Sequence, residues 1–249
     1  GQATGKTITP FVLPIVFAEA ENSNGLLKVL IYLGCVMLFC NAPFLNNQKP
    51  YMILRCKRKG WYLGENMYLW LAAFLYMLFI SLISLIAVLP TVSTNRLWGE
   101  IAGDFVVNQR SLIPVYTWGL VMPVRVIQNY YPLAAFIYTF ITGWLSIVFI
   151  GKLMYLLNLK IGKKTIGISA AVFFIMLDPV AVYFTNFKQY GLLYVSPINW
   201  SSLENINTVS GYPHLSGEYM FIMYIILIGV ESLLSYICSI KMDIEVKMI

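Results

Sequence analysis

The chain has 249 residues, of which 59% are hydrophobic and only 11% are charged, and its mean hydropathy is +0.73. Soluble domains are about half apolar and about a quarter charged, so this composition excludes an ordinary soluble globular domain. The formal net charge of +6 is interpreted as a signal of membrane topology and of contact with anionic membrane lipid, rather than of nucleic-acid binding.

A helix needs about 20 mostly apolar residues to cross the hydrocarbon core of a bilayer. Five stretches of this kind occur in the sequence, at residues 26–45, 67–89, 132–157, 166–184 and 219–240. Each is predicted to be a helix, because backbone groups in lipid must hydrogen-bond within their own segment, and none shows the alternation of a barrel strand. The expected fold is all-α, a polytopic transmembrane helical bundle that forms one domain over residues 1–249.

Basic residues gather in the loops after the first and third predicted spans and in the tail after the fifth. Because cytoplasmic loops carry an excess of Lys and Arg, these three segments are expected on the cytosolic side of the membrane. They contain Lys49, Arg55, Lys57, Arg58, Lys59, Lys160, Lys163, Lys164, Lys241 and Lys247. Five spans with a cytosolic C-terminus would place residue 1 outside. We therefore expect a sixth span before residue 1; the alternative is that residues 8–18 dip into the outer leaflet.

Several apparent chemical motifs fail on inspection. The opening residues GQATGKT resemble a phosphate-binding loop, but one residue is missing between the two glycines, and prolines follow where a helix should begin. His214 is the only histidine and has no Cys or carboxylate neighbours at ligand spacing, so no metal site is expected. The four cysteines are scattered and predict no disulfide framework. The chain is therefore not expected to be an enzyme.

Glu231 lies in the middle of the last predicted span, where a charge is costly and usually faces a partner group or a wet cavity. One interpretation makes Glu231 a gate or a contact along a substrate path. The other, which we favour because polar contacts between membrane helices are common, makes it a carboxyl group that holds helices together through Ser232 or a tyrosine. Lys152 is expected to extend its amine to the membrane interface. Asp178, just before Pro179, is expected to end a helix near the outer surface.

Residues 49–65, KPYMILRCKRKGWYLGE, combine basic and aromatic side chains in a hairpin between two predicted spans. This stretch resembles the coupling helix of the permease subunits of type-2, exporter-class ABC transporters. The chain is most similar to the small Gram-positive permeases that serve peptide and antimicrobial export or immunity. In that family a cytosolic ATPase holds the coupling helix in a groove, and ATP-driven closure of the ATPase dimer moves the membrane helices. The coupling residues that the resemblance implies are Leu54, Arg55, Lys57, Arg58, Trp61 and Glu65.

The resemblance further implies an ATP-driven exporter in a bacterial plasma membrane, with a peptide, antimicrobial or lipid-like amphiphile as substrate. ATP and Mg would be bound by the partner subunit and no cofactor by this chain, and a second permease chain would complete a homodimer or heterodimer. Two departures from the family are visible: its first helix is absent, and a polar stretch at 201–217 replaces part of its short re-entrant helices. Two alternatives are a non-transporting accessory or sensor subunit and a lipid-modifying membrane enzyme, the latter disfavoured because convergent acid, base or metal-binding groups are missing.

Overall fold

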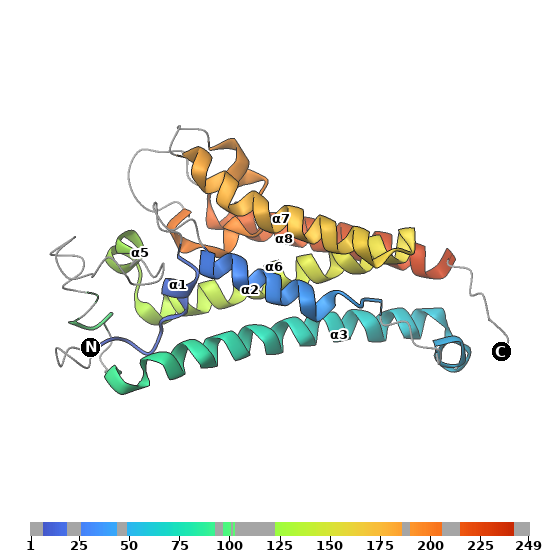
Figure 1. The fold of residues 1–249 in the computed structure, drawn as a ribbon, viewed down its shortest axis with the longest axis horizontal. Coiled ribbons are helices and arrows are strands. Elements are labelled where there is room, and N and C mark those ends of the chain that lie inside the picture. The colour runs from blue at the N-terminus through green and yellow to red at the C-terminus, as the bar shows by residue number, and fades with distance from the viewer. Residues whose placement is uncertain are drawn as a thin grey trace.

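The computed structural model describes residues 7–18, 26–43, 49–92, 97–100, 102, 123–185, 190–205 and 215–241. Within these ranges the architecture is built from helices, and the only β pairing is an isolated parallel bridge between Ile8 and Val92. The longer helices run along one common direction and form an elongated bundle (Figure 1). The predicted all-α fold is confirmed.

The helices in chain order are α1 (Leu13–Val16), α2 (Leu26–Phe39), α3 (Lys49–Val88), α5 (Val124–Asn129), α6 (Pro132–Ile161), α7 (Lys164–Thr185) and α8 (Gly217–Lys241). Short 3-10 turns form η1 (Leu89–Thr91), η2 (Gly191–Tyr194), η3 (Asn199–Ser201) and η4 (Leu203–Asn205). In the described part of the chain, four helices, α3, α6, α7 and α8, are long and apolar enough to cross a bilayer. The chain is therefore a membrane protein.

The first predicted span is shorter than the sequence suggested. α2 has only 14 residues, which corresponds to a rise of roughly 21 Å, less than the hydrocarbon thickness. The chain turns at residues 40–43, where Pro43 cannot continue a helix because it lacks an amide hydrogen. The prediction of a full span at 26–45 was wrong in length. α2 nevertheless belongs to the core, since Tyr32, Cys35 and Phe39 are fully buried.

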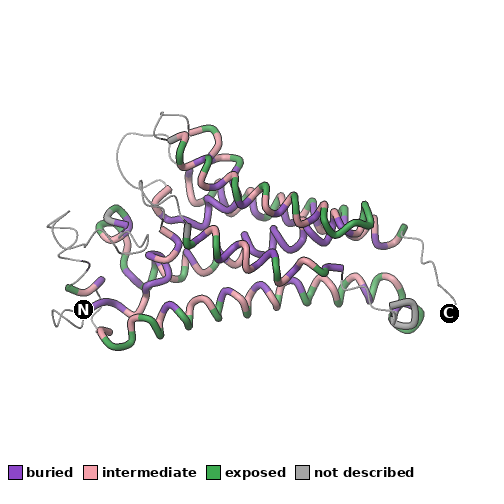
Figure 2. The backbone as a smooth tube through the Cα atoms, in the orientation of Figure 1, coloured by how far each residue is buried: buried purple, intermediate pink, exposed green. Residues whose placement is uncertain are grey.

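The core lies around α6, which packs against α2, α3, α7 and α8. Figure 2 shows buried residues concentrated along the middle of the bundle, while the outward side of α3 stays exposed. Two glycines of α6 permit this packing. A Cβ atom at Gly143 would lie 2.6 Å from Met77 of α3, and one at Gly151 would lie 3.1 Å from the Phe39 ring of α2. Small residues at these positions let the neighbouring helices approach closely.

The described parts of the three basic segments lie at one end of the bundle. The start of α3, the turn between α6 and α7, and the end of α8 all lie at the right-hand end of Figure 1. This arrangement agrees with the expectation that the three segments share one side of the membrane. We refer to this end as the basic end.

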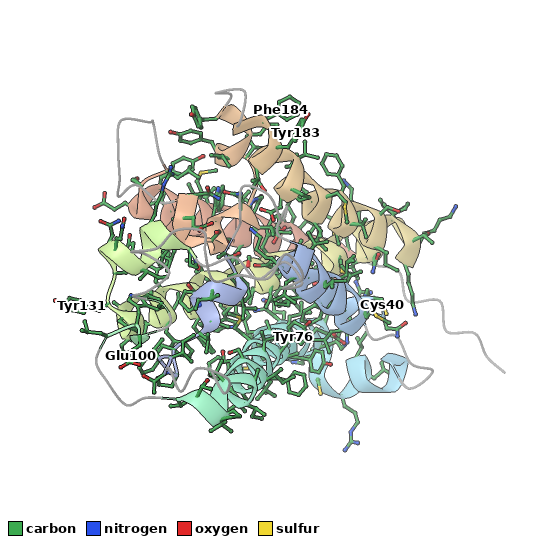
Figure 3. The ribbon with its side chains drawn as sticks, turned by 60° about the vertical axis from the view of Figure 1, so that its left-hand side comes forward. Cys40, Tyr76, Glu100, Tyr131, Tyr183 and Phe184 are labelled. Atoms are coloured by element: carbon green, nitrogen blue, oxygen red, sulfur yellow. The ribbon has the colours of Figure 1, made fainter. Side chains whose placement is uncertain are left out.

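The opposite end carries α1, α5 and the three turns η2–η4 (Figure 1). Aromatic side chains are exposed here: Tyr131 is 74% exposed and Tyr183 is 55% exposed, and both are labelled with Phe184 in Figure 3. Exposed tyrosines at the end of a span are typical of a membrane–water interface.

Residues 190–205, which we call the tucked segment, enter the bundle at this opposite end. Its turns η2, η3 and η4 place Asn199, Trp200 and Ser201 almost completely out of contact with solvent. The polar residues after position 201 were interpreted as a departure from the family's re-entrant helices. The structure shows that the polar residues 201 and 202 are themselves packed inside, whereas residues 206–214 lie outside the described ranges.

Candidate functional site

α3 is divided by a sharp break at its basic end. The backbone of Lys57 has φ 61° and ψ 164°, a conformation that side-chain-bearing residues rarely adopt and that costs on the order of 1–3 kcal/mol. Residues 49–56, which we call the short arm, form a separate helical piece before this break. In Figure 1 the short arm is seen almost end-on, so it crosses the direction of the long part of α3.

Three of the six predicted coupling residues lie on or beside the short arm and face outward. Leu54 is 79% exposed, and Arg55 and Lys57 are also exposed. An exposed leucine flanked by two cations is a surface that combines apolar and positively charged contact groups. These three side chains are therefore accessible to a molecule that approaches the basic end of the bundle.

The other three predicted coupling residues contact neighbouring helices instead. Trp61 is only 7% exposed, and its ring lies 6.5 Å from the ring of Tyr155 on α6. An Nη of Arg58 donates a hydrogen bond to the carbonyl oxygen of Ile240, at the end of α8. Glu65 is half-buried and interacts electrostatically with Tyr155. The sequence could not separate these residues from the outward-facing ones, because the break at Lys57 changes which face of α3 meets the bundle.

Tyr62 adds a further link between α3 and α8. Its hydroxyl donates a hydrogen bond to the carbonyl oxygen of Ser232, 2.8 Å away. Its ring lies 5.4 Å from the ring of Tyr236 in an edge-on arrangement. Together with the contact between Arg58 and Ile240, these interactions join the first turns after the break to the last three turns of α8.

A polar centre lies further into the bundle, where α3, α6 and α8 meet. The ammonium group of Lys152 donates to Asn66 Oδ1 at 2.6 Å and to Ser232 Oγ at 2.5 Å. It also lies 5.8 Å from the centre of the Trp70 ring, within range of a cation–π interaction. Lys152 is 3% exposed, so its amine does not extend to the interface as predicted. We call Lys152, Asn66, Ser232 and Glu231 the inner polar centre.

Glu231 is the buried carboxyl group of this centre. The residue is 6% exposed and interacts electrostatically with Lys152. Among the residues that the structure describes, its Oε2 has no hydrogen-bond partner. The predicted contact with Ser232 is not formed, because the Ser232 hydroxyl donates to the carbonyl of Ile228 and accepts from Lys152. Lys152, rather than Glu231, makes the polar contacts between the helices.

A second polar centre lies near the opposite end of the bundle. Lys28 of α2 forms an ion pair with Asp178 of α7, with its Nζ 3.0 Å from Oδ1 and 2.9 Å from Oδ2. The amide of Asn199 in the tucked segment donates to the same Oδ1 at 3.2 Å. All three residues are fully buried. Asp178 does not end α7, which continues through Pro179 to Thr185. The sequence did not reveal this pair, because its members are 150 residues apart.

Comparison with models of known protein families, with characterised proteins and with solved structures gave no match. The described ranges contain no group of three or more His, Cys, Asp or Glu side chains that could hold a metal ion.

Proposed function

We propose that this chain is the membrane-spanning subunit of an ATP-driven exporter, with a separate cytosolic subunit that binds and hydrolyses ATP. The observation that supports this proposal most is the short arm. It crosses the direction of α3 at the basic end and exposes Leu54, Arg55 and Lys57 together. Guanidinium groups pair well with carboxylates, and an exposed leucine can fill an apolar depression. A soluble partner with an acidic-rimmed groove fits this surface.

In this proposal, the contacts of α3 transmit a displacement of the short arm to the membrane-spanning helices. Arg58 and Tyr62 are bonded to the carbonyls of Ile240 and Ser232, and Trp61 is packed on α6. Motion of the arm therefore moves α8 and α6 together with α3, instead of bending one helix alone. Ser232 belongs to the inner polar centre, so the same motion reaches Lys152 and Glu231.

The inner polar centre favours the proposal that the substrate is amphiphilic, such as a peptide, an antimicrobial compound or a lipid-like molecule. Charged groups within a membrane bundle are costly. They generally face the interior of the bundle or a water-filled cavity and mark a pathway for a substrate or an ion. In the proposal, Glu231 offers an acceptor oxygen to the polar part of such a molecule while its apolar part contacts the surrounding helices. A second permease chain would complete the pathway, as the family resemblance implies.

Substitutions in the short arm test this proposal directly. We expect Leu54→Ala combined with Arg55→Glu to abolish co-purification of the proposed ATP-binding subunit, when the two chains are co-expressed. Loss of an apolar contact and reversal of a charge at a docking surface cost about 2 kcal/mol or more, a loss of about 30-fold in affinity. The measurement is the ratio of the two subunits after affinity purification in detergent.

The matched control is Ile161→Ala combined with Lys163→Glu. These residues are also exposed at the basic end, so the control makes the same kinds of change outside the short arm. It should retain the ATP-binding subunit. If the short-arm variant retains it at the parental ratio, the arm is an ordinary basic loop and the proposal loses its support. If the subunits associate and hydrolyse ATP but move no substrate, the accessory or sensor alternative is favoured.

A further inference from the structure

The tucked segment is a polar stretch of chain held inside an apolar bundle. Asn199, Ser201 and Ser202 are fully buried, although serine and asparagine are usually exposed. The Oγ atoms of Ser196 and Ser202 are buried without a hydrogen-bond partner among the described residues. Burying polar groups in this way is unfavourable unless other interactions compensate for it. Specific contacts must therefore hold the segment in place.

Contacts of two kinds hold it. On one side, α8 holds the segment through neutral hydrogen bonds: Tyr224 donates to the carbonyl of Pro197 at 2.6 Å, and Tyr219 donates to that of Tyr194 at 3.0 Å. The Trp200 ring also packs 5.1 Å from the Tyr224 ring. On the other side, the contact is ionic. Asn199 donates to the Asp178 carboxylate, which is paired with Lys28.

The ionic side joins three separate elements at one point. Lys28 comes from α2, Asp178 from α7 and Asn199 from η3, and the amide of Asn205 in η4 donates to Asn199 Oδ1 at 3.0 Å. Glu204, in η4, adds a further electrostatic attraction on Lys28. The position of the tucked segment is therefore coupled to the charge state of one buried ion pair.

The geometry points to a charge latch, in which the Lys28–Asp178 pair holds the tucked segment in a closed, buried position that can open toward the aqueous phase. A fully buried ion pair gains little net stability, because its attraction only offsets the loss of hydration of both charges. When the segment moves out, water can reach both charges and restore that hydration. The pair thus specifies the closed arrangement without preventing opening, whereas apolar residues of similar size would hold the segment more tightly. The role of the latch as an outer gate depends on the proposed function, but the latch itself does not.

The latch can be tested on the membrane chain alone in lipid nanodiscs, where both faces are accessible. Cys35, Cys40, Cys56 and Cys238 are first replaced, and Ser202→Cys is introduced as a probe of the buried side of the segment. A charged maleimide should modify it slowly in the parent. With Lys28→Met or Asp178→Asn, one charge is left buried without its partner. We expect modification to become about tenfold faster or more, since such a loss strongly favours opening.

Three control measurements accompany the rate of modification at position 202. Val195→Cys, at a residue of the same segment that is 61% exposed, should react quickly in every background. Lys163→Met removes an exposed lysine at the basic end and should leave the rate at position 202 unchanged. The double variant Lys28→Met with Asp178→Asn removes both charges of the pair and keeps an amide oxygen as acceptor for Asn199, so position 202 should react nearly as slowly as in the parent. An unchanged rate in both single variants, or an equal acceleration by Lys163→Met, would overturn the latch. Neither result would bear on docking of an ATP-binding subunit.

Discussion

Replacing Trp61 with alanine is expected to destabilise the membrane chain by about 3 kcal/mol or more, because removal of a large buried ring leaves a cavity and its lost contacts. Trp61 is 7% exposed and lies against Tyr155, so its ring is part of the packing between α3 and α6. The measurement is the free energy of unfolding in mixed micelles titrated with a denaturing detergent. Leu54→Ala, at a side chain that is 79% exposed, should leave this free energy almost unchanged.

Trp61→Phe is the matched variant, since it keeps an aromatic ring against Tyr155 and should lose less stability than alanine. If Trp61→Ala has the same free energy of unfolding as the parent but no longer binds the ATP-binding subunit, the indole is a docking group, as the family resemblance implied. A loss of both stability and binding would instead show that Trp61 acts on docking through the fold. For this reason the docking experiment uses Leu54 and Arg55 rather than Trp61.

Replacing Lys152 with methionine is expected to be far more damaging than replacing Glu231 with glutamine. Lys152→Met removes the donor to Asn66 and Ser232 and the cation that interacts electrostatically with the buried Glu231. Leaving a buried polar group without its hydrogen-bond partner typically costs about 1–3 kcal/mol, and more for a charged group. Glu231→Gln preserves the shape of the side chain and leaves both hydrogen bonds of Lys152 in place. Its effect on the free energy of unfolding should therefore be small.

The double variant Lys152→Met with Glu231→Leu checks the cause of this loss. With no charge left in the centre, a large part of the stability lost by Lys152→Met should return. No recovery would mean that the hydrogen bonds to Asn66 and Ser232, rather than charge compensation, dominate. Transport by Glu231→Gln then separates the two interpretations of Glu231: unchanged transport in a stable protein would exclude a role along the substrate path.

Apolar length and loop charge predicted the helical class, the positions of the four long helices and the end at which the basic segments meet. These features depend on properties that each segment carries alone, such as the cost of unpaired backbone groups in lipid. The length of α2 was overestimated, because the apolar residues continue past Pro43 and the composition does not show that the chain turns there.

The polar centres depend on contacts between distant segments and were mostly missed. The position of Lys152 near the end of a span suggested an amine at the interface, but the presence of Asn66 and Ser232 within reach is decided by helix packing. Asp178 was expected to end a helix, although the fold pairs it with Lys28. The sequence did contain one signal for this pair, namely a lysine and an aspartate within or beside apolar stretches. Charges in such positions require partners.

The proposal that the short arm docks an ATP-binding subunit is tested most directly by photocrosslinking from position 54. A benzophenone amino acid at Leu54, which is 79% exposed on the arm, is compared with one at Leu63, which is 56% exposed on the long part of α3. With the proposed ATP-binding subunit co-expressed in whole cells, irradiation should join position 54 to that subunit, and position 63 should give no such product. A crosslink from neither position, or an equal crosslink from both, would contradict the account.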